Sequence, residues 1–397
     1  MGFREIFSKL GKVEDHPEIL KIYCYDFSFI PKLFSSFIKK PVIVVQPSSV
    51  EDLLQILKLC ERYEIPLVPR GSATSAYGGS VPLKSCVIVD FKKMSRFEFQ
   101  DGKVIAESGA IWIDIEREAR KRGEALRIYP TSALVSTVGG WIAQGGFGIG
   151  SLRYGGIKDN VEWLEVVDFE GVKIVKGDEL KYYVGASGAT GLITKACIKL
   201  RKNSEISSLA IESSFKEAIS KIKNAYHASF KDSKYLRLEG YKLGDTLLIC
   251  SENGENNEMG EELWRKRLTP LKIVERKKKI FSETCVPYEK AEEFFNYARN
   301  ISEGVEAVFT RDCVVFISTF SASYGNMLKA LKLVKIAEKL GGEVYAKGMF
   351  FSHKCDEELR RYKRRVDPKN LLNPGKIGWN AFSITISILE RFLWLNA

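Results

Sequence analysis

The sequence predicts an α+β fold with more than one domain, and three observations carry this prediction. Short β-branched runs alternate with an amphipathic helix through the first hundred residues. Strand patterns interrupted by helices dominate residues 95–200, and residues 201–365 mix helical and strand patterns, including a predicted helix over 211–224 and a predicted strand over 235–240. At 397 residues with 45% hydrophobic content, the chain is long enough for two domains with substantial cores.

The first elements predict a βαβ unit. Residues 1–40 predict a helical lead-in, residues 41–45 a short β-branched strand, and residues 47–52 the start of a helix with a hydroxyl cap. A second strand at 65–68 then opens into a glycine-rich loop, so this loop lies at the carboxyl end of a strand. The predicted apolar face of the helix consists of Leu53, Ile56, Leu57 and Cys60.

The loop from Pro69 to Leu83, PRGSATSAYGGSVPL, organises the rest of the chain. It holds one arginine, three glycines and four small hydroxyl residues between two apolar runs. Glycine allows close approach and positive φ, and a row of backbone amides offers donors, so the loop suits a diphosphate. For an isolated stretch of this kind, the alternative is a glycine–serine surface turn. No GxGxxG motif opens a helix here, and no GxxxxGKS sequence occurs.

Two more glycine clusters follow, at residues 136–146 and 185–194. Before and between them, residues 113–122 predict a helix that stops at a glycine, and residues 161–168 and 172–176 predict a β-hairpin. Three glycine clusters separated by strand patterns indicate one extended ligand that backbone from several loops contacts.

The net charge and the composition narrow the classes of molecule that the protein is expected to bind. A formal net charge of +11 favours anionic partners: an acidic substrate, a phosphate-bearing cofactor, an acidic protein or nucleic acid. No nucleic acid is expected, because the basic runs lack interleaved aromatics and any nucleic-acid motif. Solvated faces or an acidic-partner surface are favoured for these runs, which are Arg265–Arg267, Arg276–Lys279 and Arg360–Arg365.

Eight cysteines lie scattered without a CxxC pair, which argues against an iron–sulfur cluster or structural zinc site in this chain. The N-terminus lacks a signal-peptide pattern, and no segment reaches the length of a membrane span. We therefore expect a cytoplasmic protein. The apolar tail AFSITISILERFLWLNA would pack on its own domain, dock a partner subunit, or lie peripherally on the inner face of a membrane.

Five ordered segments carry a resemblance to a known family: PRGSATSAYGGSVPL, PTSALVSTVGGWIAQGG, YGGIKDNV, GASGATGLITKACIKL and DPKNLLNPGKIG. In order and spacing they resemble the PCMH-type FAD-binding domain of the vanillyl-alcohol oxidase superfamily, in its glycolate oxidase / D-lactate dehydrogenase branch. The resemblance implies an FAD-binding domain over residues 1–200, with subdomains at about 1–94 and 95–200. It also implies a substrate (cap) domain with an antiparallel sheet over 201–365, and a C-terminal segment, 366–397, that returns to the FAD domain.

The resemblance also implies which residues contact FAD, although any single glycine could instead serve a turn. The diphosphate would lie against Arg70, Gly71, Ser72, Ala73, Thr74, Ser75, Gly78 and Gly79. The flavin ring would lie beside Pro130, Thr131, Ser132, Thr137, Gly139 and Gly140. Gly145, Gly146, Tyr154 and Asn160 would continue along the cofactor, with Ser187, Gly188, Gly191, Ile193 and Thr194 on its adenine side. The diphosphate loop has Tyr77 but no histidine, so noncovalent FAD is expected.

The second half departs from the family pattern. The 2-hydroxy-acid enzymes carry the metal motif HxGDGNxH and a later EHGxG segment, whereas residues 316–323 and 345–350 contain neither histidine nor carboxylate. No metal site is therefore expected. The candidates for the base are Lys347, Tyr345 and His353, although His353 could simply cap a surface helix. The candidates for holding an anionic substrate are Arg237, Tyr241 and Arg311, which could equally be surface or interface residues.

The resemblance implies an FAD-dependent dehydrogenase that oxidises a small 2-hydroxy acid or related alcohol by hydride transfer to flavin N5. Electrons would pass to a protein partner, such as an iron–sulfur subunit, or to a quinone. Two alternatives stay open: a non-catalytic or electron-relaying subunit of a glycolate-oxidase-like complex, and a metal-independent sugar or lactone oxidase.

Overall fold

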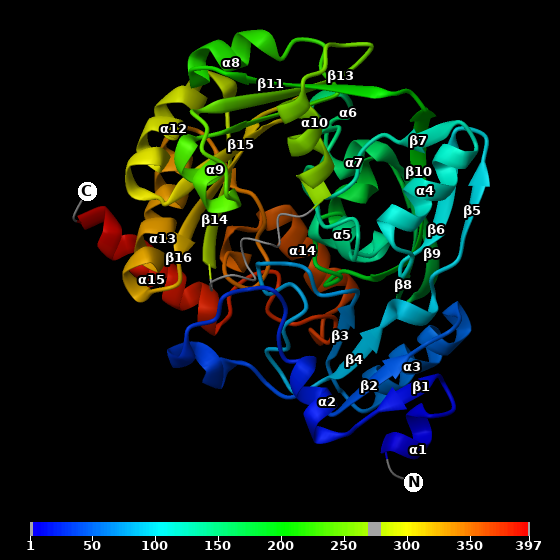
Figure 1. Cartoon of the computed structure of the whole chain (residues 1–397). Coiled ribbons are helices and arrows are strands. Elements are labelled where there is room, and N and C mark those ends of the chain that lie inside the picture. The colour runs from blue at the N-terminus through cyan, green and yellow to red at the C-terminus, as the bar shows by residue number, and fades with distance from the viewer. Residues whose placement is uncertain (1–2, 269–278, 396–397) are drawn as a thin grey trace.

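The structure is a computed structural model that describes residues 3–268 and 279–395, and it confirms the predicted α+β class (Figure 1). The strands of the described residues form three sheets of four, six and seven strands. Of the basic runs, residues 276–278 lie outside the described part of the chain. No helix among the described residues is long and apolar enough to cross a bilayer.

The four-stranded sheet has the order β1-β2-β4-β3. Strands β2 and β3 each pair in parallel with β4, and β1 pairs antiparallel with β2. Helix α3, capped by Ser49, buries the predicted face of Leu53, Ile56, Leu57 and Cys60. The elements are β1 (Lys12–Glu14), β2 (Ile43–Gln46), β3 (Leu67–Arg70), β4 (Val87–Asp90) and α3 (Val50–Arg62).

The helical prediction for residues 1–40 is only partly right. Two short helices, α1 (Phe3–Phe7) and α2 (Pro17–Ile22), and the 3-10 helix η1 (Lys32–Phe37) lie there. Strand β1 interrupts them, because Lys12–Glu14 extend the sheet edge beside β2. Pairing to a neighbouring strand is a tertiary contact, which the local sequence does not predict.

The six-stranded sheet forms the second layer, and β10 is its central strand. The predicted hairpin of residues 161–168 and 172–176 is present as β8 and β9, paired from Asp168 opposite Gly171. Trp112 and Trp141 meet edge to face in its core, with ring centroids 5.0 Å apart. The strands are β5 (Phe97–Gln100), β6 (Lys103–Glu107), β7 (Glu124–Leu126), β8 (Val161–Asp168), β9 (Gly171–Lys176) and β10 (Leu192–Lys202). The helices are α4 (Trp112–Lys121), α5 (Val138–Gln144), α6 (Ser151–Tyr154) and α7 (Ile157–Asn160).

The seven-stranded sheet is antiparallel throughout, in the order β11-β13-β12-β15-β16-β14-β17. Helices α8, α12 and α13 pack against one face, where Phe215, Phe294 and Leu333 are buried (Figure 1). The strands are β11 (Ile206–Glu212), β12 (His227–Lys231), β13 (Thr246–Glu252), β14 (Lys279–Val286), β15 (Gly304–Phe309), β16 (Val314–Ser321) and β17 (Glu343–Val344). The helices are α8 (Phe215–Lys221), α9 (Ser233–Glu239), α10 (Glu258–Arg265), α12 (Tyr288–Ile301) and α13 (Tyr324–Lys339).

Two secondary-structure predictions in this region are wrong. Residues 235–240, predicted as a strand, belong to helix α9, because Asp232 caps its start and Gly240 ends it at φ 95°. Residues 211–224, predicted as a helix, begin inside strand β11, and the helix starts only at the Ser214–Glu217 capping box.

The segment after helix α14 (Glu357–Val366) returns to the first sheet. Leu67 N–H donates to Leu371 O at 2.8 Å, and Asn373 N–H donates to Leu67 O at 2.8 Å. The Asn373 side-chain amide donates to Gly79 O at 2.9 Å and to Ser187 O at 2.7 Å, and Lys376 Nζ donates to Val81 O at 2.7 Å. This segment, residues 371–376, thereby fastens two glycine clusters to each other.

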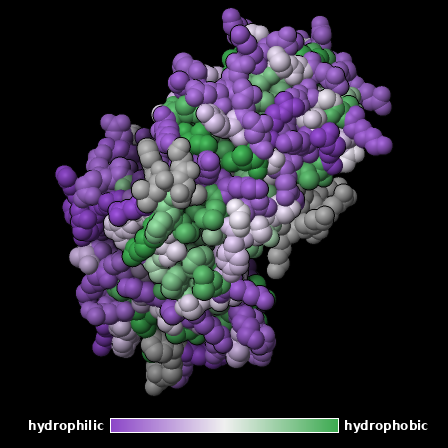
Figure 2. All heavy atoms as spheres, turned by 90° about the vertical axis from the view of Figure 1, so that its left-hand side faces the viewer, coloured by the Kyte–Doolittle hydropathy of each residue, from purple (hydrophilic) through white to green (hydrophobic). Residues whose placement is uncertain are grey.

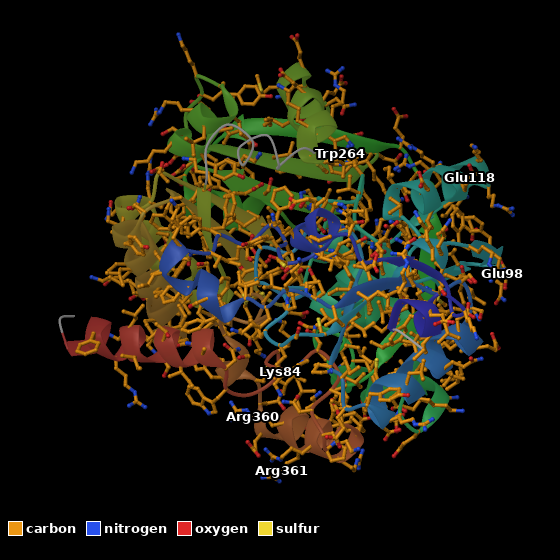
Figure 3. All side chains as sticks on the ribbon, turned by 90° about the horizontal axis from the view of Figure 1, so that it is seen from below. Lys84, Glu98, Glu118, Trp264, Arg360 and Arg361 are labelled. Atoms are coloured by element: carbon orange, nitrogen blue, oxygen red, sulfur yellow. The ribbon has the colours of Figure 1, made fainter. Side chains whose placement is uncertain are left out.

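The basic run of residues 360–365 lies on α14 and divides between solvent and interior. Arg360 and Arg361 lie at the outer edge of the molecule in Figure 3, and Arg361 and Arg364 pair with Glu357. Lys363 is buried and donates to Ala189 O at 2.8 Å. The remaining 3-10 helices are η2 (Phe91–Lys93), η3 (Gly177–Tyr182), η4 (Lys266–Leu268) and η5 (Ser352–Lys354).

The C-terminal tail forms helix α15 (Ala381–Leu395), which packs against η1 and α13. Phe382 and Ile386 are buried on its inner side. Ile384, Ile388 and Phe392, spaced four residues apart, are exposed by 46%, 49% and 60%. Figure 2 shows a hydrophobic band over α15 and the neighbouring N-terminal segment.

We predict that the contribution of Lys376 to stability rises with pH. Burial lowers the pKa of Lys376 to about 7 from 10.5, so within this window the unfolded chain binds more protons than the folded one. Relative to Lys376→Met, the free energy of unfolding of the wild type should therefore increase by up to about 1.4 kcal/mol per pH unit between these values. Urea unfolding across this range measures the difference. The half-exposed Lys369 gives the control, Lys369→Met, and a flat or falling difference for Lys376→Met would contradict the prediction.

Candidate functional site

A cavity of about 330 Å³ lies where loops of the first two sheets face the seven-stranded sheet. The β3–β4 loop, the first turn of α5 and the loop before β10 form one side. Strands β12 to β16 and helix α9 supply side chains to the opposite side. The three glycine clusters predicted to share one ligand therefore contribute to one cavity.

Most of the predicted cofactor residues line this cavity. They are Arg70, Gly71, Ser72, Ala73, Thr74, Ser75, Gly79, Pro130, Thr131, Ser132, Thr137, Gly139, Gly140, Ser187, Gly188 and Ile193. A smaller group of the predicted cofactor residues does not line the cavity: Gly78, Gly145, Gly146, Tyr154, Asn160, Gly191 and Thr194. The glycines of the second group meet the packing and turn requirements of these loops. A Cβ on Gly78 would lie 2.5 Å from Met349, and one on Gly191 would lie 2.5 Å from Val166.

Close backbone approach builds the glycine wall. A Cβ on Gly71 would lie 2.2 Å from Thr137 Oγ1, the hydroxyl that caps α5 by accepting from Gly140 N–H at 3.2 Å. A Cβ on Gly139 would lie 2.3 Å from Ser108 Oγ. These contacts hold the β3–β4 loop and α5 side by side, which brings two of the glycine clusters together.

The donors of this wall fit an elongated cofactor that carries a diphosphate. In the described part of the chain, no hydrogen bond uses the backbone N–H of Ser72, Ala73 or Thr74. Ser80 Oγ and Ser136 Oγ are buried without a hydrogen-bond partner among residues 3–268 and 279–395, and both serines line the cavity. Unsatisfied donors and hydroxyls of this kind are expected where a ligand completes the hydrogen bonding.

Arg70 has a structural task besides lining the cavity. Its guanidinium donates to Tyr23 O at 3.2 Å and Tyr25 O at 2.9 Å and lies over the Tyr23 ring. Burial lowers the pKa of Arg70. Arg70 therefore ties the N-terminal segment to the glycine loop, and backbone amides remain as the main donors toward a diphosphate.

The sheet side of the cavity carries a row of polar side chains. Cross-strand pairing aligns Lys231 with Glu306, Glu306 with Ile317, and Ile317 with Glu283. Successive side chains of a strand point to opposite faces, so residues aligned in this way share one face. We call Lys231, Glu306 and Glu283 the polar row.

Helix α9 and the glycine loop add partners to the polar row. Lys231 Nζ lies 2.8 Å from both carboxylate oxygens of Glu239 and 3.8 Å from Glu306 Oε1. Tyr235 OH donates to Glu306 Oε2 at 3.0 Å, and Tyr77 OH donates to Glu283 Oε2 at 2.7 Å. All six side chains, Tyr77, Lys231, Tyr235, Glu239, Glu283 and Glu306, line the cavity.

Burial shifts the protonation of this network. It raises the pKa of Glu283, beside which the described residues place no cation, and also raises the pKa of Glu239 despite the pairing with Lys231. His227, deeper on β12, lines the same cavity, and burial lowers the pKa of His227 to about 3, so its imidazole is neutral.

The three predicted base candidates do not converge. Tyr345 lines the cavity, but its hydroxyl accepts from Phe147 N–H at 3.0 Å and donates to Phe147 O at 2.9 Å. Lys347 lies outside the lining, 3.9 Å from Glu343. His353 is buried against α15, with Nε2 3.6 Å from Glu390 and its ring stacked on Trp379.

The three predicted substrate residues lie away from the cavity. Arg237 is exposed on α9, because the helical spacing puts Tyr235 and Glu239 on one face and residue 237 on the other. The Tyr241 hydroxyl contacts Glu262 and Lys266, and Arg311 pairs with Asp159 at 3.0 Å. In residues 3–268 and 279–395, no group of three histidine, cysteine or carboxylate side chains is placed to hold a metal ion.

The polar row was not predicted from the sequence, because it depends on the helical state of α9 and on strand pairing. The misassigned helix α9 hid the spacing of Tyr235 and Glu239, which identifies a shared face once the segment is helical. A lysine or glutamate near a strand end, as at Lys231 and Glu306, offers no signal of the partner strand it will face. In FSETCV, Glu283 stands two residues from Phe281 and from Cys285, a spacing that puts the three side chains on one face of a strand but does not identify the strand that Glu283 will face.

The chain is similar to known FAD-binding proteins. Residues 41–176 match the family model described as FAD binding domain, and residues 348–377 match the C-terminal domain of FAD linked oxidases. Glycolate oxidase subunit GlcD of Bacillus subtilis is 30% identical over 192 residues, which cover 45% of this chain and 40% of that protein. Alkyldihydroxyacetonephosphate synthase of Trypanosoma brucei brucei is 29% identical over 183 residues, which cover 42% of this chain and 30% of that protein.

Other comparisons extend over most of the chain. D-lactate dehydrogenase of Archaeoglobus fulgidus is 23% identical over 439 residues, covering 92% of this chain and 98% of that protein. A solved structure of alkyldihydroxyacetonephosphate synthase superposes with a TM-score of 0.72 at 17% identity, covering 94% of this chain and 85% of that one, which shows a shared fold. The first two relatives are matched over less than half of their own length.

One family model matches segments that wall the cavity, and the other matches the C-terminal segment that fastens its loops. Both matches agree with the hydrogen-bond donors found at the cavity. FAD is the cofactor that these matches support. The chain carries the FAD-binding domain and the C-terminal domain of the PCMH-type FAD-linked oxidases, over residues 41–176 and 348–377.

Proposed function

We propose that this chain is an FAD-dependent dehydrogenase that oxidises a CH–OH donor, either a small 2-hydroxy acid or a related alcohol. One observation carries the proposal: the loops of the FAD-binding region and the polar row of the seven-stranded sheet line the same cavity. A donor held by the row would therefore lie against the cofactor. The printed names of the relatives, glycolate oxidase subunit and D-lactate dehydrogenase, support this class of reaction.

The residues of this chain would divide the work between the two walls. Backbone amides at Ser72 to Thr74 and the hydroxyls of Ser80 and Ser136 would bind FAD, which supplies a two-electron acceptor for the donor's C–H hydrogen. The glycine loop Pro69–Leu83 contains neither histidine nor cysteine, which supports noncovalent binding. The apolar residues Phe281 and Val308 would exclude water beside the polar row.

Electrons would leave to a protein partner or a quinone. The relative from Bacillus subtilis is named as a subunit of glycolate oxidase, which favours a partner protein. A partner with an iron–sulfur centre would fit, because no group placed for a metal occurs among the described residues of this chain.

The first test is to purify the chain and record its flavin spectrum. We expect acid precipitation to release FAD into the supernatant, because binding is noncovalent. Anaerobic addition of glycolate, D-lactate or sugar lactones should bleach the flavin band with at least one of these donors. An oxidised spectrum that no donor changes would favour the non-catalytic or electron-relaying subunit, and a protein without recoverable FAD would overturn the proposal.

A second prediction tests the glycine wall directly. Gly79 lines the cavity, and a Cβ there would meet only Ser75 Oγ at 3.7 Å and Ser187 Oγ at 3.8 Å, so a side chain fits the chain but occupies cofactor space. Gly79→Val should lower the FAD content of the purified protein at least about tenfold while its unfolding midpoint in the flavin-free state changes little. Gly325→Val, at an open position on α13, is the matched control and should retain FAD. Full FAD occupancy in Gly79→Val would count against this wall as the binding site.

We also propose a peripheral location at a membrane with anionic lipids. The exposed apolar residues of α15 adjoin η1, where Leu33 is exposed as well. Exposed basic residues lie on these two helices or directly after η1, which suits anionic headgroups: Lys32, Lys39, Lys40 and Arg391.

Vesicle sedimentation tests this location. The protein should pellet with vesicles of phosphatidylcholine mixed with phosphatidylglycerol and stay in solution with phosphatidylcholine alone. The triple variant Ile384→Ser, Ile388→Ser, Phe392→Ser should lose binding, because it removes the apolar stripe of α15. The control Val172→Ser, Ile174→Ser alters exposed apolar residues of β9 and should bind like the wild type. Equal loss in both variants would contradict the proposal, as would absence of binding by the wild type.

A further inference from the structure

A second cavity, of about 90 Å³, adjoins the first and lies between the N-terminal segment, strand β14 and helices α13 and α15. Phenylalanine rings from separate stretches of the chain line it, among them Phe29, Phe34 and Phe382. Leu331 of α13 and Ile386 of α15 add aliphatic side chains. The lining is therefore mostly apolar.

The polar side chains of this lining already have hydrogen-bond partners. Ser282 Oγ and Thr385 Oγ1 donate to backbone carbonyls of α13 and α15, at 3.0 Å and 2.8 Å. Lys279 Nζ lies 2.5 Å from Glu303 Oε2 and is paired with it. A cavity whose polar groups are satisfied in this way offers water few partners, so an apolar ligand gains free energy by filling it.

The two cavities meet at a shared wall formed by Phe27, Ala76, Tyr77, Phe281 and Glu283. The Tyr77 hydroxyl donates to Glu283 Oε2 at 2.7 Å, and among the described residues no hydrogen bond reaches Glu283 Oε1. Burial raises the pKa of Glu283, which favours the protonated carboxyl and gives the shared wall a hydrogen-bond donor. Phe27 is 44% exposed, so the shared wall lies next to the surface of the molecule.

The outer surface beside the second cavity is apolar as well (Figure 2). On α15, Phe382 and Ile386 line the cavity, whereas Ile384 and Ile388 are exposed. On η1, Leu33 is 70% exposed and the next residue lines the cavity. The cavity therefore lies behind the apolar surface for which we propose membrane contact, and a ligand dissolved in the bilayer would reach it there.

We propose that the second cavity binds the hydrocarbon chain of a lipid-soluble quinone, whose ring then lies in the first cavity beside Tyr77 and Glu283. The quinone site rests on the proposed function and names the acceptor of its electrons. A volume of about 90 Å³ is smaller than the roughly 150 Å³ of an apolar cavity that holds benzene, so it suits a chain and leaves the ring to the larger cavity. The quinone gains two electrons and two protons and becomes a quinol, and the same electrons and protons leave the reduced FAD.

The position of the shared wall favours a quinone over other lipids. The first cavity is lined by the loops of the FAD-binding region, so a ring beside Tyr77 and Glu283 lies in the same cavity as the cofactor. A ring carbonyl accepts the hydrogen bond that a protonated Glu283 offers. An aliphatic lipid would fill the second cavity equally well but has no group that takes up electrons.

Binding of two quinones to the full-length flavoprotein tests the chain site without turnover. Decylubiquinone and ubiquinone-0 have the same ring system, and only decylubiquinone carries a long hydrocarbon chain. Calorimetry should show at least about tenfold tighter binding of decylubiquinone, because buried methylene groups add affinity. Equal affinity of the two quinones would overturn the inference. Binding of 1-decanol as tight as that of decylubiquinone would overturn it in favour of another lipid.

Thr385→Phe tests where the chain lies. Thr385 lines the second cavity and not the first, and it is half-buried on α15, so a phenyl ring there takes the space of the chain. The variant should bind decylubiquinone only as weakly as ubiquinone-0, with the FAD content of the wild type. Ala381→Phe adds the same ring at an exposed position of α15 outside both cavities and is the matched control. A preference for decylubiquinone that survives in Thr385→Phe would overturn the second cavity as the chain site. If Thr385→Phe does not fold, the two quinones on the wild type still decide.

Reoxidation of the flavin separates this inference from the proposed function. Dithionite reduces the bound FAD without any donor, and stopped-flow absorbance then follows its reoxidation under anaerobic conditions. Below saturation, decylubiquinone should reoxidise it at least about tenfold faster than ubiquinone-0, and Thr385→Phe should abolish the difference. Equal rates with the two quinones would overturn the inference and leave the dehydrogenase intact. A flavin that no donor reduces, but that decylubiquinone reoxidises with this preference, would contradict the dehydrogenase and support the quinone site.

Discussion

The cavity depends on the hydrogen bonds that residues 371–376 make with the glycine loops. The Asn373 side chain donates to Gly79 O and Ser187 O, and Lys376 donates to Val81 O. One side-chain amide therefore joins two clusters that are far from it along the chain. Ser187 lies 186 residues before Asn373, and Gly79 lies 294 residues before it.

This fastening links cofactor binding to completion of the fold. Contacts between residues so distant in sequence form late, because closing long loops costs entropy before the contacts are made. The strands of the seven-stranded sheet lie in sequence between the glycine clusters and residues 371–376, so the chain segment closed by these contacts contains that whole sheet. The cofactor wall is therefore a product of the whole chain, although most of its residues come from the first half.

Local patterns in the sequence predicted those elements whose structure depends on local interactions. The apolar face of α3, the β8–β9 hairpin and the glycine clusters follow from periodicity and turn chemistry, and the structure contains all three elements. The polar row could not be predicted in the same way, because its members become neighbours only through the register of four strands. Lys347 was assigned by its position in a motif that this chain has lost, and His353 because it follows that segment; the structure puts them beside β17 and α15 instead.

The two walls of the cavity come from separate stretches of the chain. The predicted cofactor residues that line the cavity lie before position 194, whereas Lys231, Glu283 and Glu306 stand on strands whose backbone pairing does not involve the glycine loops. A strand tolerates exchange of a side chain on one face with little effect on its hydrogen bonds. New chemistry could therefore evolve, or be engineered, on the sheet alone, with the flavin scaffold inherited unchanged.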